Sequence, residues 1–211
     1  MRKDTSLGLT IINALRSETV SSVGKEYLEL GVDSLLESGA LKDIPLVNTV
    51  VGVVNIAGSV REQLLAKKIL HFLVRLSEVP QAERIAMTER LNGDDKFAGR
   101  AGAVVIEMLD RMESDIKPEL AAKSFGAYAR GVISFEELRR LLVALERIPS
   151  FDICRLDEFS RTTVENPLKY DEALLLSFVN AGLAQNNGGF DGGVIIPTDL
   201  CKKFVEVVLC S

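Results

Sequence analysis

Few residues of this sequence could perform acid–base or nucleophilic chemistry, and they are scattered along it. His71 is the one histidine of the 211 residues, and it lies in an amphipathic segment directly before Phe72. A histidine in such a place is more often a boundary residue of the core than a catalyst. The sequence has no phosphate-binding or dinucleotide-binding glycine motif, no HExxH and no GxSxG. We therefore expect a protein that is not an enzyme, with no catalytic residues and no cofactor.

Acidic residues also fail to form a metal-binding pattern. The segment Gly131–Glu137 is similar to the end of a calcium-binding EF-hand loop, but three ligand positions of that loop carry no carboxylate here: Gly126, Tyr128 and Arg130. Ser134 and Glu137 instead have the spacing of a helix capping box. Adjacent acids such as Asp94 and Asp95 point to different helix faces, which weakens a shared metal site. We expect no bound metal.

The three cysteines are widely spaced and odd in number: Cys154, Cys201 and Cys210. This pattern favours neither a disulfide framework nor a zinc site, and it is typical of a reducing cytoplasm. The first residues carry mixed polar side chains rather than an apolar run, so we expect no signal peptide. The expected location is the cytoplasm, with a peripheral association with the inner membrane as the alternative.

The most unusual segment is Ile44–Val60, which has 17 consecutive uncharged and mostly apolar residues. Its small and polar residues fall on one helical stripe: Asn48, Gly52, Asn55 and Ser59. One interpretation is a central helix whose stripe packs closely against a neighbour. The other is a segment that enters a membrane and associates through the stripe, although 17 residues is the lower limit for a span. We take this stripe as the candidate interaction or membrane site and favour the buried helix.

Around this segment the hydrophobic periodicity predicts a mainly α protein. Apolar residues recur at helical spacings, prolines mark the starts of helices, glycines mark their ends, and one capping box is present. These signals predict helices in the following ranges: 9–36, 61–76, 80–92, 97–112, 118–128, 135–148, 156–163, 171–181 and 199–209. The glycines at 188–193 and the β-branched run 194–196 predict a hairpin. We expect a helical region at residues 1–150 and a small α+β module at residues 151–211.

The C-terminal sequence resembles the second half of a winged-helix domain over residues 171–209. A helix ends in Gly182-Leu183, a glycine-rich hairpin follows, and Thr198-Asp-Leu-Cys-Lys-Lys203 starts a last helix. The resemblance implies a recognition helix and a two-stranded wing. A DNA-reading helix needs basic or amide side chains, but the segments 171–181 and 184–194 contain no Lys or Arg. The net charge of −5 also disfavours binding to phosphates.

A second resemblance covers residues 35–145. The run Leu41-Lys-Asp-Ile-Pro45, the apolar segment and the basic amphipathic segment after Ser59 are similar to a group of uncharacterised bacterial helical proteins. This similarity implies a bacterial origin and assigns no activity or functional residue.

Three functional classes follow from these observations. The first is a non-enzymatic interaction or regulatory protein that binds a protein partner or forms a homo-oligomer through helical surfaces. The second is a membrane-active stress or phage-defence effector that releases the helix at 44–60. The third is a winged-helix regulator that binds nucleic acid. Composition and motifs favour the first.

Overall fold

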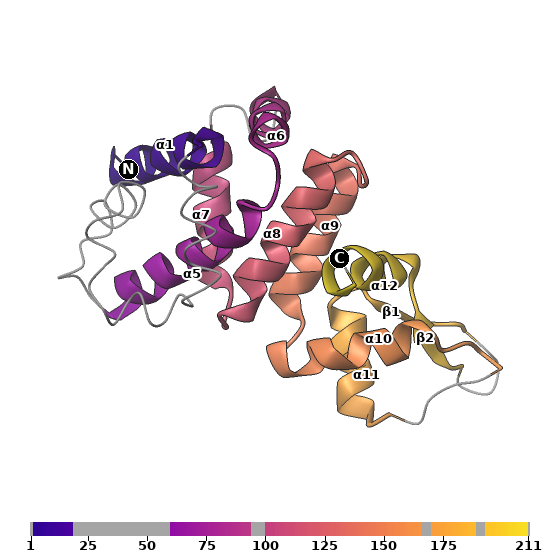
Figure 1. The fold of residues 1–211 in the computed structure, drawn as a ribbon. Coiled ribbons are helices and arrows are strands. Elements are labelled where there is room, and N and C mark those ends of the chain that lie inside the picture. Colours follow the sequence, from indigo (N-terminus) through magenta and orange to yellow (C-terminus); the bar gives the residue numbers. More distant parts are fainter. Residues whose placement is uncertain (1, 19–59, 94–99, 166–169, 189–192, 211) are drawn as a thin grey trace. The chain divides into compact units, whose positions relative to one another are not determined.

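A computed structural model describes residues 2–18, 60–93, 100–165, 170–188 and 193–210 (Figure 1). The described chain is mainly α, with one short two-stranded hairpin among helices near the C-terminus, which confirms the expected fold class. It divides into two compact units, Met1–Arg130 and Gly131–Ser211. The predicted boundary at residue 150 differs from this division, because the helix at 135–147 belongs to the second unit.

The first unit contains the helices α1 (Arg2–Arg16), α5 (Val60–Leu76), α6 (Gln81–Gly93), α7 (Ala101–Arg111) and α8 (Ile116–Ala129). α5 packs along α8. Ile69, Phe72 and Leu73 of α5 are buried, as its apolar spacing predicts. The ring of Phe72 meets that of Phe125 edge to face, with centroids 5.4 Å apart. These two helices supply a large part of the core of this unit.

Two glycines bring α1 and α7 into close contact. Gly8 and Gly102 face each other where the helices cross, and a Cβ on Gly102 would overlap the backbone of Gly8. Without side chains at this point, the two backbones approach more closely than other residues would allow. Further along α1, the side chains of Ile11 and Leu15 are buried.

A buried arginine joins the ends of two helices. Arg84 of α6 is fully buried, and its guanidinium donates hydrogen bonds to the carbonyl oxygens of Leu15, Ser17, Ser77 and Val79. These carbonyls lie at the C-terminal ends of α1 and α5, where helices leave acceptors without a partner inside the helix. The positive charge also complements the negative ends of the two helix dipoles. Burial lowers the pKa of Arg84.

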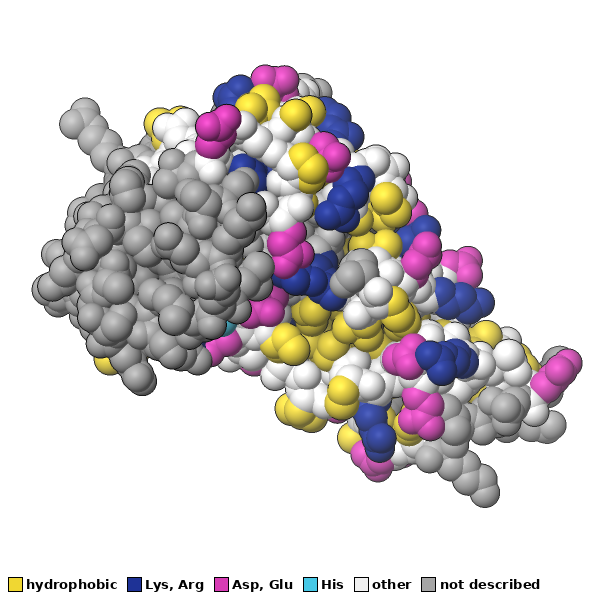
Figure 2. Space-filling model, in the orientation of Figure 1, with side chains coloured by type: hydrophobic (Ala, Val, Ile, Leu, Met, Phe, Trp, Pro, Cys, Tyr) yellow, Lys and Arg dark blue, Asp and Glu magenta, His cyan; other side chains and the backbone are white. Residues whose placement is uncertain are grey.

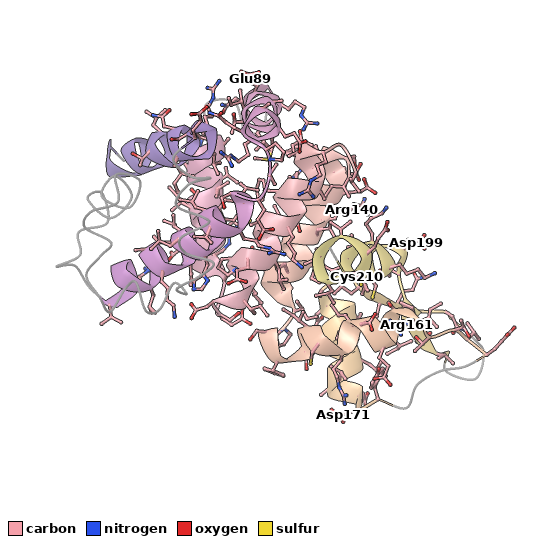
Figure 3. All side chains as sticks on the ribbon, in the orientation of Figure 1. Glu89, Arg140, Arg161, Asp171, Asp199 and Cys210 are labelled. Carbon is pink, nitrogen blue, oxygen red and sulfur yellow. The ribbon has the colours of Figure 1, made fainter. Side chains whose placement is uncertain are left out.

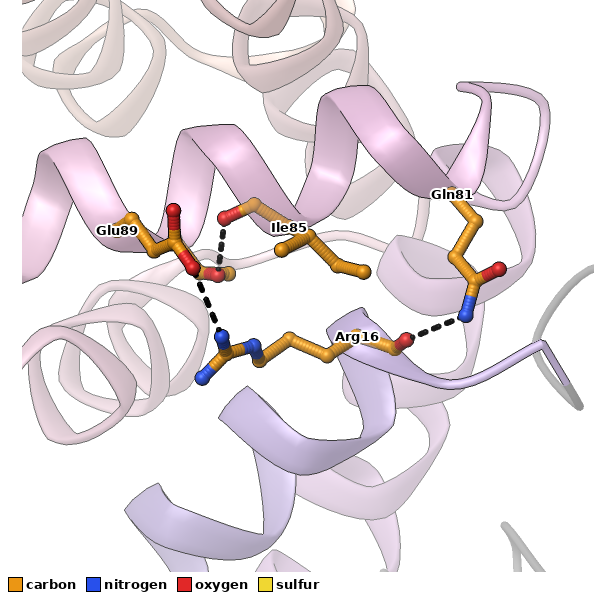
Figure 4. Close-up of polar contacts among 5 residues, drawn as sticks. Arg16, Gln81, Ile85 and Glu89 are labelled. Atoms are coloured by element: carbon orange, nitrogen blue, oxygen red, sulfur yellow. Dashed lines mark hydrogen bonds and ion pairs between the residues drawn. The ribbon is translucent and has the colours of Figure 1, made fainter.

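Surface contacts add to the packing of α1 against α6 (Figure 4). Arg16 Nη2 lies 3.1 Å from Glu89 Oε1, and Gln81 Nε2 donates to the carbonyl oxygen of Arg16 over 2.9 Å. The ion pair is exposed, so its contribution to stability is small. The carbonyl contact occupies one further acceptor at the end of α1.

The second unit begins with α9 (Phe135–Arg147), followed by the 3₁₀ turn η2 (Ser150–Arg155) and α10 (Leu156–Ser160). The predicted capping box is confirmed. The Ser134 hydroxyl accepts from the Glu137 N–H over 3.2 Å, and the Glu137 carboxylate accepts from the Ser134 N–H over 2.7 Å.

The rest of this unit is a helix, a hairpin and a last helix: α11 (Glu172–Asn180), β1 (Ala184–Asn186), β2 (Ile195–Pro197) and α12 (Asp199–Phe204), which continues as a π-helical turn over Val205–Leu209. The strands pair antiparallel, with Gln185 opposite Ile196. Gly182, at which the sequence predicts the end of α11, has φ +75°, a left-handed conformation typical of a helix C-terminus. The Thr198 hydroxyl accepts from the Cys201 N–H and caps α12, at the place where the sequence predicts the last helix to start. The winged-helix resemblance itself stays a prediction.

Candidate interaction surface

The stripe selected from the sequence lies outside the described residues. Asn48, Gly52, Asn55 and Ser59 all fall in the range 19–59, so both interpretations of this segment stay predictions. Within the described ranges, none of the helices combines the length and apolar character that crossing a bilayer requires.

His71 lies on α5 and faces α8. Its Nδ1 is 2.8 Å from Glu119 Oε1, and its side chain is largely buried. Nε2 is buried and finds no hydrogen-bond partner among the described residues. One turn earlier, Lys67 Nζ lies 2.6 Å from Asp115 Oδ2. Together these two contacts form a polar edge between α5 and α8.

The cysteines and acidic residues that the structure describes do not cluster into a candidate metal site. Cys154 and Cys210 are exposed, whereas Cys201 is buried, and burial raises the pKa of its thiol to about 12. Among the described residues no group of three metal-ligating side chains comes together. The hydrogen bonds from Ser134 lower the pKa of Glu137, which is the role of a capping residue.

The clearest unexplained feature of the second unit is α11. Its sequence is Glu-Ala-Leu-Leu-Leu-Ser-Phe-Val-Asn, yet Phe178 is its one buried residue. Leu176 is 48% exposed and Val179 is 37% exposed. A helix on a protein surface normally buries its apolar side and exposes polar residues. α11 therefore presents apolar side chains to solvent.

Contacts on the opposite side hold α11 in place. The ring of Phe178 packs against Phe159 of α10, with centroids 4.8 Å apart. Ser177 Oγ donates to Asp152 Oδ2 over 2.9 Å, which ties α11 to η2. Beside them, burial and the nearby negative charge of Glu158 raise the pKa of Tyr170 to about 12. These contacts leave the outward side of the helix uncovered by the described residues of this unit.

We define the α11 surface by five residues: Phe151, Leu176, Val179, Glu172 and Arg147. Phe151 precedes Asp152 and is 78% exposed. In Figure 2, apolar side chains gather over the region of η2 and α11. Exposed apolar groups that cluster in this way are typical of a binding surface.

The two ends of the α11 surface carry opposite charges. Asp171 and Glu172 lie at the N-terminal end of α11, where Asp171 projects away from the fold (Figure 3). At the other end, Arg147 Nη1 of α9 approaches the carbonyl oxygen of Asn180 to 3.5 Å. Within the described part of the chain, neither Glu172 nor Arg147 forms an ion pair. Both charges are exposed.

Sequence reasoning identified α11 as a helix but did not select it as a site. A usable signal was the run Leu174-Leu175-Leu176, which spans more of the helix circumference than one buried face needs. The exposure of Phe151 has no comparable signal, because a 3₁₀ turn has no long periodicity to read. No family model, no curated protein and no solved structure matches this chain.

Proposed function

We propose that this chain is a non-enzymatic interaction protein that binds a protein partner through the α11 surface. The observation that carries the proposal is the apolar helix α11, of which Phe178 alone is buried. Exposing such side chains in the free state favours association, because a partner that covers them removes apolar area from water. Aromatic and large aliphatic residues such as Phe151 and Leu176 are typical centres of protein interfaces.

Charge supports a protein partner over nucleic acid. Neither α11 nor the segment 184–194 contains Lys or Arg, and residues 151–211 carry five basic and nine acidic side chains. Phosphate binding depends on cations along the contact surface. An acidic unit with an apolar helix instead suits a partner whose own surface is apolar at the centre.

The test compares two valine substitutions in the full chain. Val179→Ser removes an apolar side chain from the α11 surface. Val132→Ser makes the same change at another exposed valine, which is 55% exposed and precedes the start of α9. α9 has 13 residues and is therefore about 20 Å long, which places Val132 far from Arg147.

The tagged chain is isolated from the cells that naturally produce it, together with the proteins that co-purify with it. Each co-purifying protein is then purified separately and mixed with the purified chain, and the affinity between the two is measured. Self-association of the purified chain is measured in parallel. We expect a reconstituted complex that Val179→Ser weakens at least tenfold and Val132→Ser leaves unchanged. Equal binding by both variants, or the absence of any reconstituted complex or oligomer, would show that the proposal is wrong.

A further inference from the structure

The distribution of charge along α11 points to a particular partner. The helix has nine residues, so its two ends are about 13 Å apart. The acidic end carries Glu172 and the basic end carries Arg147 beside Asn180, with Leu176 midway between residues 172 and 180. A surface with an apolar centre and opposite charges at its ends is complementary to itself after a rotation of 180°.

We infer that the α11 surface binds a second copy of this chain, with the two α11 helices antiparallel about a twofold axis near Leu176. This inference rests on the proposed function and names its partner. In a twofold interface each residue pair occurs twice, once in each direction. Glu172 of one copy therefore meets Arg147 of the other, and the reverse contact is identical. The two Leu176 side chains meet at the axis.

The apolar contacts determine how strong this dimer is. A stable interface of standard size buries about 800 Å² on each partner. One helix of nine residues supplies only part of that area, and Phe151 on η2 extends it on the side where Asp152 contacts Ser177. We therefore expect a dimer that dissociates on dilution. The charge pairs at its rim set the orientation of the two copies.

Charge reversal tests the twofold arrangement directly. In a Glu172→Arg homodimer, the introduced arginine would face Arg147 of the other copy. In an Arg147→Glu homodimer, the introduced glutamate would face Glu172. Both single variants should dimerise at least tenfold more weakly than the wild type. When the two variants are mixed, one of the two charge pairs joins the introduced arginine to the introduced glutamate, and the other joins the native Glu172 to the native Arg147. The mixture should therefore form a heterodimer with close to wild-type affinity.

The dimer is measured on the full chain by sedimentation velocity across a dilution series, with native mass spectrometry to identify the heterodimer. Recovery in the mixture would also show that both variants are folded. Circular dichroism of each single variant provides the same control if no recovery occurs. The double variant carrying both reversals should dimerise like the wild type, because its pairs are again opposite in charge.

A chain that is monomeric at all concentrations would overturn the inference, as would folded single variants that dimerise like the wild type. A mixture of folded variants without heterodimer would also overturn it. These results leave the proposed function standing if Val179→Ser still weakens a complex with a different protein. The proposed function fails separately, when Val179→Ser changes no association at all.

Discussion

Arg84 Nε donates a hydrogen bond over 2.9 Å to the carbonyl oxygen of Leu15, the penultimate residue of α1. The same guanidinium contacts the carbonyl of Val79 at 2.9 Å, just beyond the end of α5. One side chain of α6 thus satisfies acceptors at the C-terminal ends of two other helices. The charge is buried among several backbone carbonyl dipoles, which together replace part of its hydration.

We predict that Arg84→Met lowers the free energy of unfolding by about 3 kcal/mol, because it leaves buried carbonyls unpaired. Arg84→Lys should also destabilise, since a single ammonium cannot reach acceptors that lie around a planar guanidinium. Urea unfolding followed by circular dichroism measures both effects. A variant as stable as the wild type would show that the carbonyls find other partners.

The crossing of α1 and α7 gives a second prediction. Gly102→Ala should destabilise the first unit by about 2 kcal/mol or more, because its Cβ would overlap the carbonyl of Gly8 and force the helices apart. Gly93→Ala is the matched control. Among the described residues nothing lies within 4 Å of a Cβ at Gly93, and alanine favours helix, so stability should be unchanged or slightly higher. Equal melting temperatures for the two variants would contradict the close crossing.

The capping box of α9 is open to a direct test. Ser134→Ala removes the hydroxyl that accepts from the Glu137 N–H, and it should cost about 1 kcal/mol of unfolding free energy. Ser134→Asp keeps an acceptor at the cap and should retain most of the stability. Thermal unfolding of the three proteins at neutral pH distinguishes these cases. A loss as large in Ser134→Asp as in Ser134→Ala would show that the hydroxyl does not act as a cap.

Acid should weaken the same cap. The pKa of Glu137 is lowered in the folded state, so the folded protein binds this proton less readily than the unfolded chain. Its contribution is therefore present above the ordinary carboxyl pKa of about 4.3, and it is lost as the pH falls through the lowered value. Glu137→Gln should be less stable than the wild type at pH 7, and the difference should shrink below about pH 4. A difference independent of pH would contradict this role.

The cysteines should differ in reactivity. Cys154 and Cys210 are exposed and should react with a thiol reagent in the folded protein. Cys201 should react only after unfolding, because it is buried and its pKa is raised to about 12. A spectrophotometric thiol assay with and without denaturant should give two and then three equivalents. Three fast equivalents in the native protein would mean that the helix α12 opens readily.

Much of the secondary structure follows from the sequence. The ranges of α5, α6, α9 and α11 agree with the predictions to within about two residues, because local signals fix them. Pro80 precedes α6, Ser134 and Glu137 cap α9, and Gly182 follows α11 in a left-handed conformation. These signals act over one helical turn, so no tertiary contact is needed to read them.

The sequence by itself therefore determined a mainly α chain with a C-terminal hairpin, an acidic second half and no recognisable catalytic motif. Only the tertiary structure decided which apolar residues are covered. Leu73 and Leu176 are both leucines on apolar helices, yet Leu73 is 1% exposed because α8 packs on α5, whereas Leu176 is 48% exposed. Helical periodicity states which side chains share a face, but burial depends on what another segment places against that face.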